Sequence, residues 1–151
     1  TSLAPQEGAA APARPPRAVL VGHGRVGSLI ARALRDQGTD FVAIEDNLAL
    51  AQQLQATGVR AIAGNGASSD LLVEAGLGSA DLLFVTVPNG FEAGRIVEAA
   101  RQINPAIKVL ARAHSDAEVE HLRRFGADLI ISGELEIAQA MMRAARAMSP
   151  R

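Results

Sequence analysis

The nine residues VLVGHGRVG, from Val19 to Gly27, decide how this chain folds. A short apolar run leads into three glycines with the spacing G-x-G-x-x-G, and a segment of helical periodicity follows at once. Between a strand and a helix, this spacing is typical of a turn that holds the phosphate of a nucleotide. Gly22 permits the tight turn, Gly24 lets a phosphate approach the backbone, and Gly27 lets the helix pack closely on the strand. The N-terminus of the helix then directs N–H groups and partial positive charge at the phosphate.

Short apolar segments and segments of helical periodicity alternate along the chain from residue 17 onward. Nearly continuous apolar strands are typical of a parallel sheet that is covered on both faces. We therefore expect an α/β, Rossmann-type, doubly wound sheet of six parallel strands in the order 3-2-1-4-5-6. A ligand would bind where the order reverses, at the loops after Gly22 and Val87. The predicted strands are residues 17–22, 40–45, 59–64, 81–87, 107–113 and 128–132, and the predicted helices are residues 25–38, 46–58, 68–76, 89–104, 115–126 and 133–148.

The first 16 residues differ in composition from the rest of the chain. They hold four of the seven prolines and show no apolar periodicity. This composition favours a Pro/Ala-rich linker at residues 1–16, with a tag or cloning remnant as the alternative. We expect the nucleotide-binding domain to span residues 17–149, and a linker at the front suggests that another domain precedes it.

Composition excludes several classes of function. The net charge of −1 lacks the basic footprint of a nucleic-acid-binding protein, and Phe is the only aromatic residue type. The absence of cysteine excludes disulfides and thiolate chemistry. No apolar run approaches the length of about 20 residues that spans a bilayer, and the first residues lack the apolar core of a signal peptide. We therefore expect a soluble, cytoplasmic domain with no nucleic-acid partner.

A carboxylate stands where the second predicted strand ends. Glu45 follows Gly27 by 18 residues, a position from which a carboxylate accepts hydrogen bonds from ribose hydroxyls. Asp46 is adjacent and can share this role, or it can serve only as the N-cap of the next helix. A carboxylate here also repels a 2′-phosphate, so the sequence favours NAD(H) or a simple adenine nucleotide over NADP.

Two further loops and the rest of the glycine turn complete the expected site. The loop GNGAS, after the third strand, could border the adenine, although it could equally be a turn whose Ser68 caps the next helix. The loop TVPNG ends the fourth strand at the switch point, and its Asn89 could instead be a plain N-cap. The expected cofactor-binding residues are Gly22, His23, Gly24, Arg25, Val26, Gly27, Glu45, Asp46, Asn65, Gly66, Ala67, Val87, Pro88 and Asn89. Within this set, Arg25 would add a phosphate contact and His23 would contribute its backbone.

An enzyme is the alternative interpretation, in the form of a small NAD-dependent oxidoreductase subunit. Such an enzyme needs a second region to bind its substrate and a side chain to transfer a proton. One Rossmann unit accounts for the whole periodic part of the chain, and there is no tyrosine. The three histidines show no metal-ligand spacing such as H-E-x-x-H, and we expect neither catalytic nor metal-binding residues.

Two helices carry apolar stripes that predict packing surfaces. In the first helix, the residues expected to face the sheet are Val26, Leu29, Ile30, Ala33 and Leu34. In the last helix, flexible methionines suit an adaptable interface between subunits, and packing on the domain's own core is the alternative. The stripe of the last helix consists of Ala138, Met141, Met142, Ala145 and Met148.

Several segments together resemble the TrkA-N (RCK-N) domain, over residues 17–148. They include the glycine turn, FVAIEDN (41–47), GVRAIAGNGAS (58–68), VPNGFEAG (87–94), ARAH (111–114) and GELEIA (133–138). The resemblance extends to the C-terminal domains of Kef-like cation:proton antiporters of the YbaL-type branch. It implies a regulatory, non-enzymatic domain at the cytoplasmic face of the inner membrane, attached to an N-terminal membrane transporter domain. It further implies a homodimer in which NAD(H) or an AMP-type adenine nucleotide gates cation flux.

Overall fold

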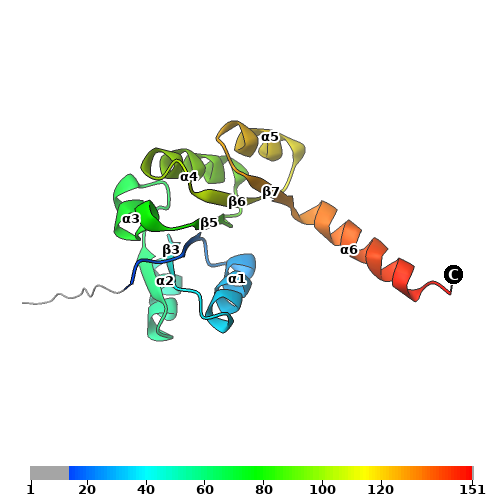
Figure 1. The fold of residues 1–151 in the computed structure, drawn as a ribbon, viewed down its shortest axis with the longest axis horizontal. Coiled ribbons are helices and arrows are strands. Elements are labelled where there is room, and N and C mark those ends of the chain that lie inside the picture. The colour runs from blue at the N-terminus through cyan, green and yellow to red at the C-terminus, as the bar shows by residue number, and fades with distance from the viewer. Residues whose placement is uncertain (1–13, 151) are drawn as a thin grey trace, which may run out of the picture.

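Six parallel strands form one sheet in the order β4-β3-β2-β5-β6-β7 in this computed structural model, which describes residues 14–150 (Figure 1). Read by position among the six strands, this is the predicted order 3-2-1-4-5-6, and the doubly wound Rossmann-type fold is confirmed. The switch point lies between β2 and β5, where Val21 is in register with Val85. The strands are β2 (Ala18–Val21), β3 (Phe41–Glu45), β4 (Arg60–Ala63), β5 (Leu82–Val85), β6 (Lys108–Ala113) and β7 (Leu129–Ser132).

The helices follow the strands at the boundaries that their capping residues set. Helices α2 to α6 each begin after a side-chain N-cap, contributed by Asn47, Ser68, Asn89, Ser115 and Ser132 in turn. A side-chain oxygen at this position satisfies N–H groups that the first turn leaves without partners. The helices are α1 (Arg25–Asp36), α2 (Leu48–Ala56), α3 (Ser69–Glu74), α4 (Gly90–Ile103), α5 (Asp116–Arg124) and α6 (Gly133–Met148), with a 3₁₀ turn, η2 (Leu77–Ser79), before β5.

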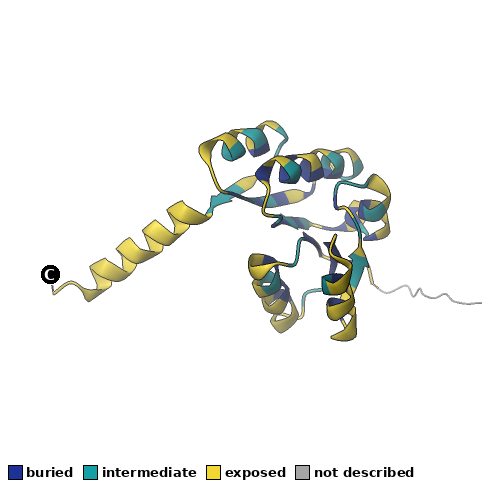
Figure 2. Cartoon of the chain, turned by 180° about the vertical axis from the view of Figure 1, so that it is seen from behind, coloured by how far each residue is buried: buried dark blue, intermediate teal, exposed yellow. Residues whose placement is uncertain are grey.

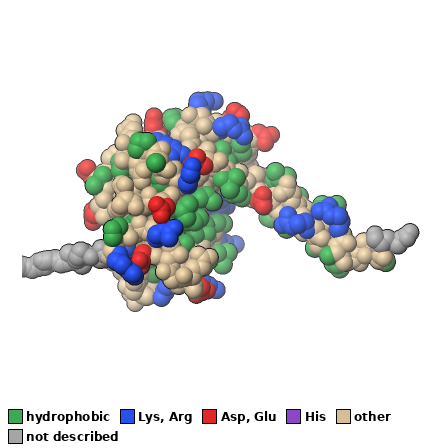
Figure 3. Space-filling view, in the orientation of Figure 1, with side chains coloured by type: hydrophobic (Ala, Val, Ile, Leu, Met, Phe, Trp, Pro, Cys, Tyr) green, Lys and Arg blue, Asp and Glu red, His purple; other side chains and the backbone are tan. Residues whose placement is uncertain are grey.

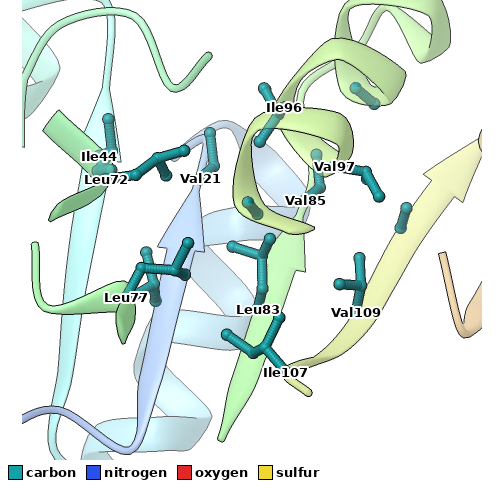
Figure 4. Packing of buried hydrophobic residues seen from close by; sticks show 14 of the residues in the cluster. Val21, Ile44, Leu72, Leu77, Leu83, Val85, Ile96, Val97, Ile107 and Val109 are labelled. Carbon is teal, nitrogen blue, oxygen red and sulfur yellow. The ribbon is translucent and has the colours of Figure 1, made fainter. Parts of the chain in front are cut away.

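One face of the sheet is closed by α3, α4 and α5. Alternate strand residues, among them Val21, Leu83 and Val109, pack there against Ile96 and Val97 of α4 (Figure 4). All five side chains are at most 2% exposed. Because burial of apolar surface is the main favourable term in folding, this face supplies most of the stability of the domain.

The other face of the sheet is closed over only part of its width. Ala18, Leu20 and Ala43 are fully buried beneath α1 and α2. On this face, no helix of the described chain covers the strands beyond β5. Leu129 on β7 is 51% exposed there. Hydrophobic side chains gather on the surface of the body next to the base of α6 (Figure 3).

Helix α6 extends away from the body instead of covering this open area (Figure 1). None of its 16 residues is buried, so the helix is exposed along its whole length (Figure 2). The alternative that its apolar stripe packs on the domain's own core is therefore wrong for this chain. The exposed large side chains are Leu135, Ile137, Met141, Met142 and Met148.

The first helix faces the sheet with smaller residues than expected. Its buried residues are Gly27, Ala31 and Leu34, whereas Leu29 is 63% exposed. Of the predicted face Val26, Leu29, Ile30, Ala33 and Leu34, only Leu34 is buried. The close approach of α1 to β2 explains the difference, because a Cβ at Gly27 would overlap the carbonyl oxygen of Gly22. Small residues therefore occupy the contact, and the bulkier apolar residues turn toward the open part of the sheet.

Residues 14–16 of the predicted linker lie against the body. Arg14 forms an ion pair with Asp40 at 3.2 Å, and Pro16 is buried next to Gly76. The rest of the predicted linker, residues 1–13, lies outside the described residues. None of the helices in the described part is both long and apolar enough to cross a membrane.

Candidate functional site

A cavity of about 630 Å³ opens at the carboxyl ends of the strands, at the switch point. In open α/β sheets this is where ligands bind, because the loops on the two sides of the switch point diverge. The cavity is large enough for a nucleotide. Its walls are Val21, Gly22, His23, Gly24, Arg25, Val26, Ile44, Glu45, Asp46, Asn47, Leu50, Gly64, Gly66, Thr86, Val87, Pro88, Glu92, Ile96 and Arg112.

Thr86 fixes the conformation of the glycine turn. Gly22 has a φ of +100°, a conformation that favours glycine, and a Cβ there would lie 2.7 Å from Thr86 Oγ1. The Thr86 hydroxyl is 3.1 Å from the carbonyl oxygens of both Val21 and Gly22, to which it can donate. Thr86 is buried and directly follows β5. It therefore connects the turn to the strand on the other side of the switch point.

Helix α1 begins without a side-chain cap, unlike the five other α-helices of the described chain. Its N-cap is Gly24, which offers no side chain, and open space surrounds the position of a Cβ there. The N–H groups of the first turn of a helix need an acceptor, and they carry the positive end of the helix dipole. The uncapped end of α1 therefore presents N–H donors without side-chain acceptors at the wall of the cavity, the arrangement that suits an anion.

Glu45 is tied to the glycine turn by its carboxylate. The backbone N–H of His23 donates to Oε1 at 2.8 Å, and that of Asn47 donates to Oε2 at 2.6 Å. Burial alone would raise the pKa of Glu45, but the N–H of Asn47, the Asp46 side chain and the N–H of His23 outweigh it and lower the pKa. Glu45 is thus an ionised carboxylate that holds the turn in place while it faces the cavity.

Asp46 lies beside Glu45 and has the opposite shift. The hydrogen bond with the Glu45 side chain raises the pKa of Asp46, and burial and the charges of Glu45 and Glu92 add to the effect. Asp46 does not cap α2, since the N-cap is Asn47, whose side chain accepts from the N–H of Leu50. The interpretation of Asp46 as only an N-cap is therefore wrong, and its side chain remains at the wall of the cavity.

The cavity has charged side chains of both signs. Glu45 ends β3 and Asp46 follows it, and Glu92 comes from the first turn of α4. Arg25 opens α1, and Arg112 stands near the end of β6, on the other side of the switch point from β3. The carboxyls at the end of β3 offer acceptors for the hydroxyls of a ligand, and the two arginines offer donors for its anionic groups.

Of the fourteen expected site residues, the structure brings ten together around the cavity, and four lie outside its walls. Gly27 serves the packing of α1 on β2, as expected. The Asn65 side chain accepts from the N–H of Ala67 at 2.7 Å, within its own loop. Asn89 caps α4 by accepting from the N–H groups of Phe91 and Glu92. The ten around the cavity are Gly22, His23, Gly24, Arg25, Val26, Glu45, Asp46, Gly66, Val87 and Pro88.

Sequence reasoning missed Arg112, Thr86, Glu92 and Asn47 among the polar residues of the cavity. Thr86 and Glu92 lie in or next to the TVPNG loop, so this loop was the available signal. Arg112 comes from β6, within the segment ARAH, and only the pairing of β6 with β5 brings it to the cavity. The remaining missed residues contribute apolar surface or backbone.

A second, apolar groove of about 280 Å³ adjoins the cavity on the open part of the sheet. Ile30, Phe84, Leu110 and Ile131 line it, together with Gly133 at the base of α6. Val26, Thr86 and Arg112 line both the groove and the cavity, so these three residues form the wall between them.

This chain belongs to the TrkA-N domain family, whose match covers residues 18–133. Among known proteins, it is 44% identical over 125 residues to the putative cation/proton antiporter YbaL of Escherichia coli (strain K12). That match covers 83% of this chain and 22% of YbaL, so the chain spans about a fifth of this relative's length. The crystal structure of the TrkA-N domain of YbaL is similar, with 43% identity and a TM-score of 0.82 over 85% of this chain and 95% of that one.

Two more distant structures share the fold and were determined with nucleotides. The AMP-bound Kef CTD of Shewanella denitrificans is 24% identical, with a TM-score of 0.74 over 89% of this chain and 81% of that one. The NAD-bound GsuK channel is 17% identical, with a TM-score of 0.71 over 78% of this chain and 21% of that one. At this level of identity, the similarity shows a common fold.

Proposed function

We propose that this chain is the nucleotide-sensing regulatory domain of a potassium or other cation:proton antiporter, at the cytoplasmic face of the inner membrane. The observation that carries the proposal is a single cavity with the uncapped N-terminus of α1 at one wall and Glu45 and Asp46 at another. The resemblance to YbaL, named a putative antiporter, supplies the link to transport. An N-terminal membrane transporter domain of the same protein is the partner that this function requires.

The ligand that fits this cavity is NAD(H) or an AMP-type adenine nucleotide. A phosphate would accept hydrogen bonds from the N–H groups at the start of α1. The ribose hydroxyls would donate to Asp46 and to the lone pairs of Glu45 that the N–H groups of His23 and Asn47 leave free. A 2′-phosphate would face two neighbouring carboxyls, so NADP is disfavoured. AMP in the Kef CTD and NAD in the GsuK channel support this class of ligand.

Calorimetric titration of the chain with AMP, NAD, NADH and NADPH tests the binding step. We expect AMP and NADH to bind, and NADPH to bind at least about tenfold more weakly, the factor that corresponds to about 1.4 kcal/mol. Asp46→Ala should weaken NADH binding by about tenfold. Asp116→Ala, which removes an exposed carboxylate on α5, is the matched control and should change nothing. If no nucleotide binds, or if NADPH binds as tightly as NADH, the proposed ligand class is wrong.

Regulation requires that the nucleotide bind two states of the protein with different affinity. The test is cation transport by the full-length protein in vesicles, with and without NADH on the side of this domain. We expect NADH to change the transport rate of the wild type and to have little effect on Asp46→Ala. Transport that ignores nucleotide in the wild type, while the isolated domain binds it, would contradict the regulatory role.

We also propose that the chain functions as a homodimer in which each copy covers the other's open sheet face. Helix α6 starts at Gly133, directly after β7. Because no loop separates the strand from the helix, the chain does not turn back to place α6 over the groove. The helix presents an apolar stripe that nothing in the described residues 14–150 covers, and the groove at its base is apolar. Two copies related by a twofold axis can place each α6 in the partner's groove, which satisfies both surfaces at once.

Sedimentation of the wild type against Met141→Glu tests this arrangement. Met141 is 67% exposed, so the substitution should leave the folded monomer intact. A charge buried in an apolar interface should weaken dimerisation by at least about tenfold. Gln139→Glu adds the same charge on the polar side of α6 and should leave the dimer unchanged. A wild type that stays monomeric at high concentration, or equal effects of the two variants, would contradict the proposed dimer.

A further inference from the structure

Arg112 differs from the other arginines of the described chain in its surroundings. Only Arg101 and Arg112 are half-buried, and the remaining arginines of residues 14–150 are exposed. Arg101 donates five hydrogen bonds, to Pro105 O, Ile107 O, twice to Gly126 O, and to the Asp128 carboxylate. In the same part of the chain, no protein acceptor lies within hydrogen-bond or ion-pair distance of the Arg112 guanidinium.

A half-buried guanidinium without acceptors is unfavourable, because it loses water and gains no partner. The guanidinium has five N–H donors and no acceptor of its own, so only an acceptor from another group can pair with them. Arg112 lines the nucleotide cavity. The acceptor that the protein does not supply is therefore one that a ligand in this cavity can supply.

The position of Arg112 in the sheet indicates which part of the ligand it would meet. Glu45 and Asp46 lie at the carboxyl end of β3, the glycine turn follows β2, and Arg112 lies on β6, with β2 and β5 between the carboxyls and the arginine. A nucleotide whose ribose lies on the carboxyls has its first phosphate at the turn. Any groups that continue beyond this phosphate extend across β5 toward Arg112.

We propose that Arg112 binds the second phosphate group of the ligand, so that the cavity selects nucleotides with a diphosphate over monophosphates. This inference rests on the proposed nucleotide-binding function and specifies its ligand further. The planar guanidinium matches phosphate oxygens in a two-point, charge-assisted hydrogen bond. Arg25, which is exposed at the first position of α1, lies beside the first phosphate and does not distinguish the two classes.

The test is the ratio of affinities for ADP and AMP, measured by calorimetry on the wild type, Arg112→Gln and Arg112→Lys. ADP and AMP share adenosine and the first phosphate, so the ratio isolates the second phosphate. We expect the wild type to bind ADP at least about tenfold more tightly than AMP, and Arg112→Gln to remove most of this preference. Arg112→Lys, which keeps the charge and loses the two-point geometry, should retain part of it.

Two control variants and a second ligand sharpen the result. Arg25→Gln should weaken ADP and AMP by the same factor, and Arg124→Gln, an exposed arginine on α5, should weaken neither. NADH, in which the second phosphate is esterified, shows whether Arg112 also binds the diphosphate of a dinucleotide, and Arg112→Gln should weaken NADH binding as it weakens ADP binding. A melting curve of each variant confirms that it is folded.

The outcomes separate the two proposals. If no adenine nucleotide binds the wild type, the proposed function fails, and the inference about Arg112 fails with it. If AMP binds as tightly as ADP, or if Arg112→Gln leaves the preference for ADP unchanged, the site stands and the role of Arg112 is overturned. Weakened dimerisation of Arg112→Gln with an unchanged preference would likewise overturn it and assign the guanidinium to the interface between subunits.

Discussion

The two faces of the sheet are built by alternate residues of the same strands, yet they are covered to different extents. On one face, α3, α4 and α5 bury Val21, Leu83 and Val109 completely or nearly so. On the other face, α1 and α2 cover the strands up to β2, and the side chains beyond β5 stay partly exposed. The closed face holds the larger cluster of buried side chains, and the open face leaves an apolar groove next to the cavity.

The largest expected effect is on the free energy of unfolding, which should fall by different amounts when leucines on the two faces are replaced by alanine. Leu83 on β5 is fully buried on the closed face, and Leu110 on β6 is half-buried in the open groove. Leu83→Ala should lower the free energy of unfolding by about 3 kcal/mol, through lost burial and an unfilled cavity. Leu110→Ala should lower it by about 1 kcal/mol in the monomer, since part of its surface is already in water. Urea denaturation at low protein concentration measures both.

Equal losses for Leu83→Ala and Leu110→Ala would mean that the two faces contribute alike to stability. At higher protein concentration, Leu110→Ala should also weaken dimerisation, because Leu110 lines the groove proposed for the partner's α6. Leu83→Ala should not do so.

The next effect contrasts the two half-buried arginines. Arg101→Gln removes donors from carbonyl groups and from Asp128, so it should destabilise the free domain by about 2 kcal/mol. Arg112→Gln removes a charge without a protein partner, so the free domain should be unchanged or slightly more stable. Thermal unfolding without nucleotide compares them, and a large loss for Arg112→Gln would show that Arg112 is structural.

The smallest expected effect is a difference in the pH dependence of stability. Burial would raise the pKa of Asp128, but the N–H of Val109 and the Arg101 side chain outweigh it and lower the pKa below its ordinary value of 3.8. The unfolded chain therefore binds this proton more readily than the folded one. The stability that Asp128 adds is present above pH 3.8 and is lost as the pH falls through the lower pKa of the folded state.

Glu45 acts in the same direction, because its pKa is lowered in the fold, and Asp46, whose pKa is raised, offsets part of its effect. Urea midpoints between about pH 6 and pH 3 should fall less steeply for Asp128→Asn than for the wild type. Identical slopes would show that Asp128 does not contribute to the acid sensitivity.

The sequence predicted the parts of this molecule that depend on local pattern. Apolar runs identified each strand, and the glycine turn with Glu45 located the switch point and one wall of the cavity. The face of α1 was predicted wrongly because the helix is apolar on two sides, and only the close approach to β2 shows that the side with Gly27 is the buried one.

Residues that come to the site only through the pairing of strands could not be predicted from the local pattern of the sequence. Arg112 is 85 residues from Gly27 in the sequence and meets the cavity only because β6 pairs with β5. The position of α6 could not be predicted either, because its apolar stripe suits both packing on the core and an interface between subunits, and the structure leaves the helix exposed. The side chains of Asn65 and Asn89 could contact a ligand, or they could stabilise a turn or cap a helix. In the structure, each accepts a hydrogen bond from an N–H group close by in the sequence.

The most direct test of the nucleotide site is an NMR titration of the ¹⁵N-labelled domain with NADH. We expect shifts at Asp46 and the largest amide shifts on the glycine turn and the first turn of α1, at Gly22, Gly24, Arg25 and Val26. These amides lie at the uncapped helix end where a phosphate would bind. Shifts confined to α5, to α6 or to the apolar groove, or no shifts at millimolar NADH, would contradict it.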